Sequence, residues 1–195
     1  EPSLLIDIKK IKETRTVTMG AEEIRIGAAM TGTELGEHAA LTAVWPGVVE
    51  AMELIGSAQV QSRATLGGNL CNASPAADSV PALIAAAAKV VIAGSNGTRE
   101  EPVEDILKGP GQTTLATDEF VVSIVLPNPP ARSGDAYLRF IPRTEMDIAV
   151  VGAGVSLSLN EDGTCAAARM ALGAVAPTAR LADATSEILV GNRLD

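Results

Sequence analysis

Hydrophobic and polar positions in the first two thirds of the chain follow both helical and strand-like spacing. Residues 46–55 (PGVVEAMELI) carry apolar side chains on one helical face, which predicts a helix. Residues 90–93 (VVIA) and 119–126 (EFVVSIVL) are short apolar runs of the kind found in buried strands. Asn96-Gly97 follows the first of these runs and predicts a hairpin. This part of the chain therefore predicts a mixture of helices and strands.

The pattern changes after the proline cluster at residues 127–130 (PNPP), which is the best candidate for a domain boundary. Residues 147–159 form a long run that alternates at its end, and residues 164–172 return after a turn at Asn160 to Gly163. We expect an antiparallel hairpin here, covered by a helix within residues 177–190. The predicted fold class is α+β. The predicted domains are residues 1–129 and residues 130–195.

Composition and charge exclude several classes of function. The chain has 195 residues, of which 47% are hydrophobic, and a net charge of -9, which argues against a nucleic-acid-binding surface. Its most apolar stretch, residues 81–93, is too short to span a bilayer, so we expect no membrane insertion. Two distant cysteines indicate a reduced, cytoplasmic protein. With a single histidine the sequence offers no metal site, and we expect no catalytic residue in it.

The stretch of residues 63–79 (RATLGGNLCNASPAADS) carries the candidate chemistry. The Gly67-Gly68 pair lacks side chains and adopts positive φ readily, so its N–H groups can form a concavity that binds phosphate. Thr65 and Asn69 flank the pair with short polar side chains, and Asp78 offers a carboxylate for the hydroxyls of an attached ribose. Alone, the pentapeptide is more often a plain turn, and it matches neither a Rossmann nor a P-loop motif.

The longer stretch of residues 60–83 (VQSRATLGGNLCNASPAADSVPAL) resembles the second FAD-binding loop of the molybdenum hydroxylase flavoproteins. That family includes the medium subunit of carbon monoxide dehydrogenase and the FAD domain of xanthine dehydrogenase. The resemblance continues through residues 119–127, 137–143 (YLRFIPR) and 147–149 (DIA). It implies a PCMH-type, vanillyl-alcohol-oxidase-like FAD-binding domain. A small α+β domain like the C-terminal domain of the CO dehydrogenase flavoprotein is implied to follow it.

The resemblance also implies which residues bind FAD. Ile55 lies where the family places a side chain against the flavin ring, and it is equally well explained as the last apolar residue of a helix. Val121 matches a backbone contact and is equally well explained as a core residue. Arg139 lies where the family usually has lysine. The planar guanidinium of arginine therefore replaces the compact ammonium of lysine at this position. Asp78 is implied to bind a ribose hydroxyl. The implied loop contacts are Thr65, Leu66, Gly67, Gly68 and Asn69.

The sequence departs from the family pattern at both ends. The family has an N-terminal subdomain with a first glycine-rich loop, and nothing before Leu4 corresponds to it. The second domain also stops short, which predicts a truncated C-terminal domain. We therefore expect an FAD-binding domain that lacks its N-terminal subdomain, and weak FAD binding by the sequence as it stands.

The function implied by the resemblance is that of an FAD-binding electron-transfer subunit. Molybdopterin and the 2Fe-2S clusters are expected only on partner subunits, an iron–sulfur subunit and a molybdopterin subunit. One alternative is a stand-alone PCMH-fold flavin oxidoreductase, although the sequence shows no catalytic Ser or Glu and no covalent His or Cys beside a flavin. The other is a non-catalytic interaction subunit that has lost FAD, against which the intact TLGGN loop and Asp78 argue.

Overall fold

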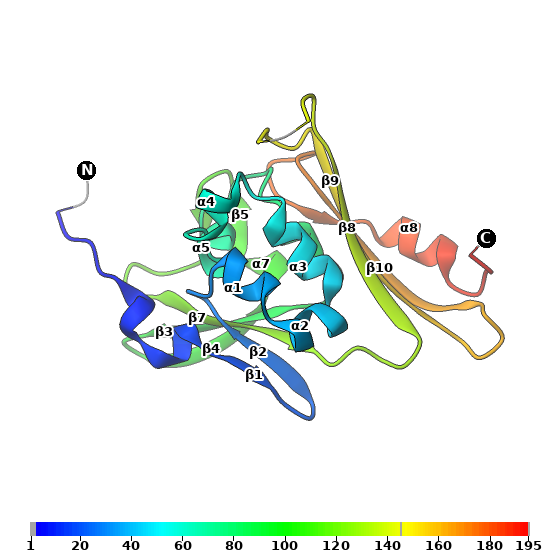
Figure 1. Ribbon diagram of the computed structural model, residues 1–195, viewed down its shortest axis with the longest axis horizontal. Helices are drawn as coiled ribbons and strands as arrows, with labels where there is room; N and C mark the ends of the chain where they lie inside the picture. The colour runs from blue at the N-terminus through cyan, green and yellow to red at the C-terminus, as the bar shows by residue number, and fades with distance from the viewer. Residues whose placement is uncertain (1–2, 145, 195) are drawn as a thin grey trace.

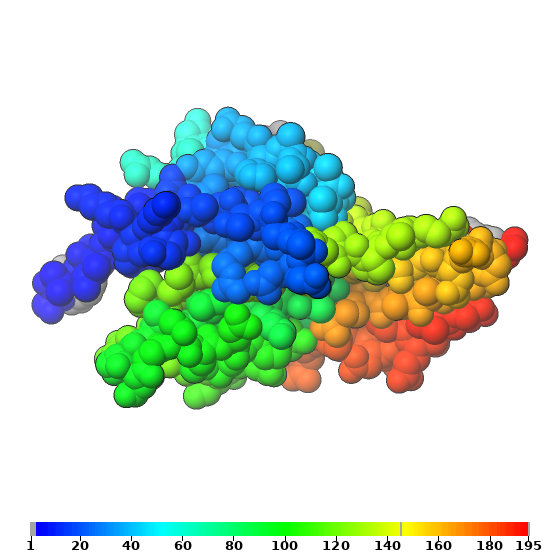
Figure 2. All heavy atoms as spheres, turned by 90° about the horizontal axis from the view of Figure 1, so that it is seen from below, coloured from blue at the N-terminus to red at the C-terminus, as the bar shows by residue number. Residues whose placement is uncertain are grey.

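The computed structural model describes residues 3–144 and 146–194 and contains two larger antiparallel sheets with helices between them (Figure 1). In the space-filling view the C-terminal part of the chain forms a lobe beside the first sheet (Figure 2). The predicted α+β class is confirmed. The first sheet has the strand order β1-β2-β7-β3-β4, and the second has the order β11-β10-β9-β8.

The apolar runs of residues 90–93 and 119–126 form two strands of the first sheet, as the sequence predicts. The Asn96-Gly97 hairpin joins the first of these strands to a polar strand, and Gly97 has φ +108° at the turn. Ile24, Ile26 and Ile124 are fully buried on this sheet and form its side of the core. The strands are β1 (Val17–Met19), β2 (Glu23–Gly27), β3 (Lys89–Gly94), β4 (Gly97–Pro102) and β7 (Phe120–Pro127), and a small sheet pairs β5 (Leu107–Gly109) with β6 (Gln112–Thr113).

The helices of the first domain are short. Helix α1 is capped by Thr31, which forms a capping box with Glu34. Helix α6 begins two residues before Pro81, and a proline is tolerated there because first-turn N–H groups have no helical partner. The elements are η1 (Ile8–Lys10), η2 (Lys12–Arg15), α1 (Gly32–Gly36), α2 (Ala39–Val44), α3 (Pro46–Glu53), α4 (Ala58–Gln61), α5 (Leu66–Cys71), α6 (Ser79–Ala85) and α7 (Val103–Ile106).

The second sheet contains the long hairpin that the alternating pattern predicts. Helix α6 is buried along its whole length and packs against this sheet, and Gly154 allows the close approach because a Cβ there would overlap the carbonyl of Pro81. The predicted covering helix is shorter than residues 177–190, and it packs against β10. The elements are β8 (Ser133–Phe140), β9 (Val151–Leu159), β10 (Cys165–Gly173), β11 (Arg180–Leu181) and α8 (Asp183–Leu189).

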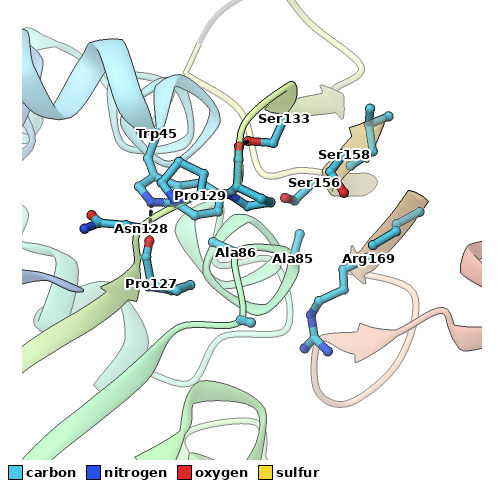
Figure 3. Close-up of a pocket in the computed structure, with 15 residues that line it drawn as sticks. Trp45, Ala85, Ala86, Pro127, Asn128, Pro129, Ser133, Ser156, Ser158 and Arg169 are labelled. Atoms are coloured by element: carbon cyan, nitrogen blue, oxygen red, sulfur yellow. Dashed lines mark hydrogen bonds between the residues drawn. The ribbon is translucent and has the colours of Figure 1, made fainter. Parts of the chain in front are cut away.

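An apolar pocket of about 180 Å³ lies where the two domains meet (Figure 3). The indole N–H of Trp45 donates to the carbonyl of Pro127 at 3.0 Å and fixes one wall. On the other side Arg169 donates to the carbonyl of Ile84 at 3.1 Å and to Glu104 at 3.0 Å. The contacts of Arg169 tie the end of α6 and Glu104 of α7 to the second sheet. Within the described residues, no helix is long and apolar enough to cross a membrane.

Asp135 of β8 makes a second junction, at the start of α3. Its Oδ2 accepts the N–H of Val48 at 3.2 Å, and its buried Oδ1 has no partner among the described residues. Burial raises the pKa of Asp135 to about 6, against the opposing effect of the Gly47 and Val48 N–H groups, and Glu50 adds to the increase. An ionised carboxylate at this position therefore lowers the stability of the native state.

We expect the Asp135→Asn variant to lose part of the pH dependence of unfolding. The native pKa lies above the ordinary value of 3.8, so the native state binds the proton more tightly than the unfolded chain does. As the pH rises from about 4 to about 7, the free energy of unfolding of the unmodified protein should therefore fall relative to that of the variant. The expected relative loss is on the order of 2 kcal/mol. Urea denaturation at several pH values measures this difference. Parallel curves for the two proteins would contradict it.

Candidate functional site

The glycine loop folds as the first turn of helix α5. Thr65 is its N-cap, and its Oγ1 accepts the N–H of Gly68 at 3.0 Å. The N–H of Gly67 donates to the carbonyl of Ala28 at 3.0 Å, and that of Leu66 to Met30 at 3.4 Å. Neither glycine has positive φ. The predicted concavity of free N–H groups is therefore wrong, because the N-cap and the chain after β2 already accept these protons.

The two glycines meet different surroundings. A Cβ at Gly67 would lie 2.7 Å from the Cβ of Ala28 and 2.8 Å from its carbonyl oxygen, so this position must be glycine for the helix to pack. A Cβ at Gly68 would approach only Oγ1 of Thr65, at 2.9 Å, and Gly68 is exposed. Gly67 thus allows α5 to pack against Ala28. At Gly68 the backbone of α5 stays exposed, with no side chain covering it.

A pocket of about 300 Å³ opens at that bare surface. Its polar edge includes the hydroxyl of Thr65, whose proton has no acceptor among the described residues. Glu119 also lines it, held by two hydrogen bonds from Arg99 that lower the pKa of Glu119 to about 2. The pocket is therefore an apolar slot whose polar edge has the hydroxyl donor of Thr65 and the ionised carboxylate of Glu119. Its other lining residues are Ile8, Ala28, Gly67, Gly68, Cys71, Leu115, Phe120 and Val121.

Asn69 connects α5 to α6. Its Oδ1 accepts the N–H of Ser79 at 3.2 Å and the hydroxyl of Ser79 at 2.6 Å. These two bonds fix the orientation of the amide, and its NH₂ group has no acceptor in the part of the chain that the structure describes. Asn69 therefore fixes the start of α6 and keeps an NH₂ donor on α5, the helix whose residues Gly67 and Gly68 line the pocket.

Asp78, directly before α6, does not line this pocket. Its carboxylate lies in a buried cluster in which Oδ1 accepts the hydroxyl of Tyr137 at 2.9 Å and Oδ2 accepts Nη1 of Arg139 at 3.0 Å. Asp78 is 8% exposed. Burial raises the pKa of Asp78, while the Tyr137 bond and the charge of Arg139 oppose that increase. Burial and the negative charge of Asp78 raise the pKa of Tyr137.

The structure thus separates the predicted site residues into groups. Leu66 is fully buried, so only its backbone can face a ligand. Ile55 packs against the core after α3, and its neighbours Leu54 and Gly56 line a hollow of about 440 Å³ together with Arg139. The roles of these residues in binding stay predictions. Thr65, Gly67, Gly68 and Val121 share the loop pocket, whereas Asp78 and Arg139 form the buried pair.

Tyr137 is the residue whose importance the sequence reasoning missed. It lies two residues before Arg139 in the YLRF motif, and therefore on the same face of a strand. It is the only tyrosine of the sequence and is 4% exposed. A tyrosine at this spacing from a strand cation was a signal that both side chains could reach one carboxylate.

Comparison with known proteins identifies the family. Residues 1–129 match the FAD-binding domain in molybdopterin dehydrogenase, and residues 136–195 match the CO dehydrogenase flavoprotein C-terminal domain. The chain belongs to the FAD-binding subunit family of the molybdenum hydroxylases. The resemblance that the sequence suggested is therefore confirmed.

Individual relatives agree with this assignment. The nicotinate dehydrogenase FAD-subunit of Eubacterium barkeri is 30% identical over 98% of this chain and 66% of its own length. The carbon monoxide dehydrogenase medium chain of Hydrogenophaga pseudoflava is 33% identical over 92% of this chain and 62% of its own. The chain spans only part of the length of these relatives. It covers 66% of the nicotinate dehydrogenase FAD-subunit and 60% of the xanthine dehydrogenase FAD-binding subunit of Escherichia coli O157:H7.

Solved structures show the same fold. Carbon monoxide dehydrogenase from Hydrogenophaga pseudoflava superposes with a TM-score of 0.91 at 33% identity, covering 97% of this chain and 65% of that chain. Quinoline 2-oxidoreductase from Pseudomonas putida 86 gives a TM-score of 0.89 at 29% identity, covering 100% of this chain and 67% of that chain. The predicted CO-dehydrogenase-like C-terminal domain is confirmed by these comparisons.

The loop pocket fits part of an FAD molecule. Because Gly68 has no side chain, a ligand can approach the backbone of the pocket closely at this position. A Cβ at Gly68 would occupy that space. The Thr65 hydroxyl is a donor suited to phosphate or hydroxyl oxygens, and Asn69 on the same helix has a second donor. The ionised Glu119 favours a cofactor hydroxyl over a phosphate beside it. Phe120 and Val121 supply apolar surface for a ring. The residues present are therefore chemically matched to the cofactor of the family.

Proposed function

We propose that this protein is an FAD-binding electron-transfer subunit of a molybdenum hydroxylase. The observation that carries the proposal is the pocket at Gly68, where a bare backbone, a hydroxyl donor and apolar walls converge in a chain of this family. We place its two functional domains at residues 1–129 and 130–195. The specific substrate is expected to be selected on a partner subunit.

The geometry of the loop changes how this chain would hold FAD. Because the first-turn N–H groups are occupied, the polar contacts come from the side chains of Thr65 and Asn69, with Gly68 allowing approach. The carboxylate of Asp78 would accept a ribose hydroxyl, and Arg139 would act beside it. Ile55 and Val121 would contribute apolar contacts. Bound FAD links one-electron carriers to two-electron acceptors.

We further propose that the protein works with an iron–sulfur subunit and a molybdopterin subunit. The relatives include a protein named as subunit alpha of the 6-hydroxypseudooxynicotine dehydrogenase complex of Paenarthrobacter nicotinovorans. The two cysteines, Cys71 and Cys165, are free thiols, which fits a reducing, cytoplasmic location. Electrons would then enter from the partner's clusters and leave through FAD to an external acceptor.

Anaerobic reduction of the flavin tests this proposal. The full-length gene product is purified alone and together with the products of its neighbouring genes, and the absorption of bound flavin is followed after adding the substrate of the complex. We expect bleaching only in the complex. Bleaching of the isolated subunit by that substrate would favour a stand-alone flavin oxidoreductase, and absence of flavin from both preparations would favour an interaction subunit that has lost FAD.

A further inference from the structure

The carboxylate of Asp78 belongs to the first domain, but both of its side-chain partners come from the second sheet. Tyr137 and Arg139 lie on β8, and Asp78 directly precedes α6. The side chains of Arg139 and Asp78 are only 8% and 11% exposed. The orientation of the Asp78 carboxylate is therefore set by a strand of the other domain.

The phenol of Tyr137 is accommodated by a specific feature of the neighbouring strand. Gly152 of β9 lies opposite Arg139 in the sheet, and a Cβ at Gly152 would overlap the hydroxyl oxygen of Tyr137 and approach its Cζ at 3.1 Å. The sheet thus keeps a space open for the hydroxyl end of the ring. Any side chain at Gly152 would displace that hydroxyl from Asp78.

The two donors leave the carboxylate able to bind something else. An ionised carboxylate has about four acceptor positions, and Tyr137 and Arg139 occupy one on each oxygen. Both oxygens are therefore fixed in space while each keeps a free lone pair. A carboxylate held in this way is preorganised for a ligand hydroxyl, which is the group that a ribose offers.

The cluster also connects to the loop pocket through adjacent residues. Ser79, next to Asp78, donates from both its N–H and its hydroxyl to Asn69 of α5. Movement of Asp78 would therefore shift Asn69, whose NH₂ group faces no acceptor among the described residues. This sequence of contacts runs from β8 to the helix that borders the pocket.

We propose that Tyr137 is a positioning residue of the FAD site, which holds Asp78 in the orientation that accepts a cofactor hydroxyl. The second sheet thereby sets the FAD affinity of the first domain. The inference rests on the proposed binding of FAD and adds to it a residue that does not itself touch the cofactor.

FAD titration of the full-length gene product tests this role. The Tyr137→Phe variant, which loses only the hydroxyl, is expected to bind FAD about tenfold more weakly. The Gly152→Ala variant keeps the phenol but displaces its oxygen, so we expect a similar loss. Gly134→Ala on β8 is the matched control, because a Cβ there meets nothing within 4 Å, and its affinity should be unchanged.

A double-mutant cycle separates positioning from simple structural support. If Tyr137 acts through Asp78, Tyr137→Phe should have no further effect in an Asp78→Asn background. An equal fold-loss in both backgrounds, or unaltered affinity in both Tyr137→Phe and Gly152→Ala, would overturn the inference while the proposed function stands. Absence of FAD binding in the unmodified protein would overturn both.

Discussion

The Gly68→Val variant is expected to lose FAD binding while it stays folded. The valine side chain would project into the loop pocket, where a Cβ meets only Oγ1 of Thr65. We expect the dissociation constant to rise at least about 100-fold, or about 2.7 kcal/mol. Because the position is exposed, the free energy of unfolding should change by only about 1 kcal/mol, including disturbance of the Thr65 cap.

The neighbouring Gly67→Val variant is the matched comparison. There the added side chain would overlap Ala28, which lies against the start of α5, and we expect a loss of about 3 kcal/mol in the free energy of unfolding. Urea denaturation and FAD titration of both variants measure the contrast. Equal destabilisation at the two positions, or unchanged affinity in Gly68→Val, would contradict the division of roles between these glycines.

Arg139→Met is expected to be the most destabilising single change in the buried cluster. It leaves the carboxylate of Asp78 buried with the hydroxyl of Tyr137 as its remaining side-chain donor. Breaking one partner of a buried ion pair costs about 3–5 kcal/mol of the free energy of unfolding. Methionine keeps most of the packing volume, so the loss should reflect the missing charge.

Two controls establish that the Asp78 charge causes this loss. The double variant Asp78→Asn with Arg139→Met removes both charges and should be more stable than Arg139→Met alone. Removing Arg139 should also raise the pKa of Asp78 further above its ordinary value. Because stability is then lost as pH rises through that pKa, the effect of Arg139→Met should be larger at pH 8 than at pH 5. A pH-independent loss would exclude this explanation.

The sequence predicted those strands whose apolar runs are continuous and bounded by clear turn residues, but it did not predict β1 or β8. The 119–126 run and the Asn96-Gly97 hairpin both appear in the structure as predicted. The alternating pattern after Asp147 also became the β9–β10 hairpin. These elements are determined by local sequence, so periodicity alone was sufficient.

The geometry of the glycine loop was not predictable from local sequence. Two glycines favour positive φ in isolation, but here the carbonyls of Ala28 and Met30 accept first-turn N–H groups and hold both glycines in a helix. The hydrogen bond between Asp78 and Tyr137 was also not predictable from local sequence, because the two residues lie 59 positions apart. The raised pKa of Asp135 likewise depends on its burial against a helix start in the other domain.

The most direct test of the central claim is a titration of FAD into the full-length gene product, followed by quenching of flavin fluorescence. Saturable binding of one FAD per chain, lost in Gly68→Val and retained in Gly134→Ala, is the predicted result. Absence of saturable binding, or binding that is indifferent to Gly68→Val, would contradict the claim that the pocket beside α5 holds FAD.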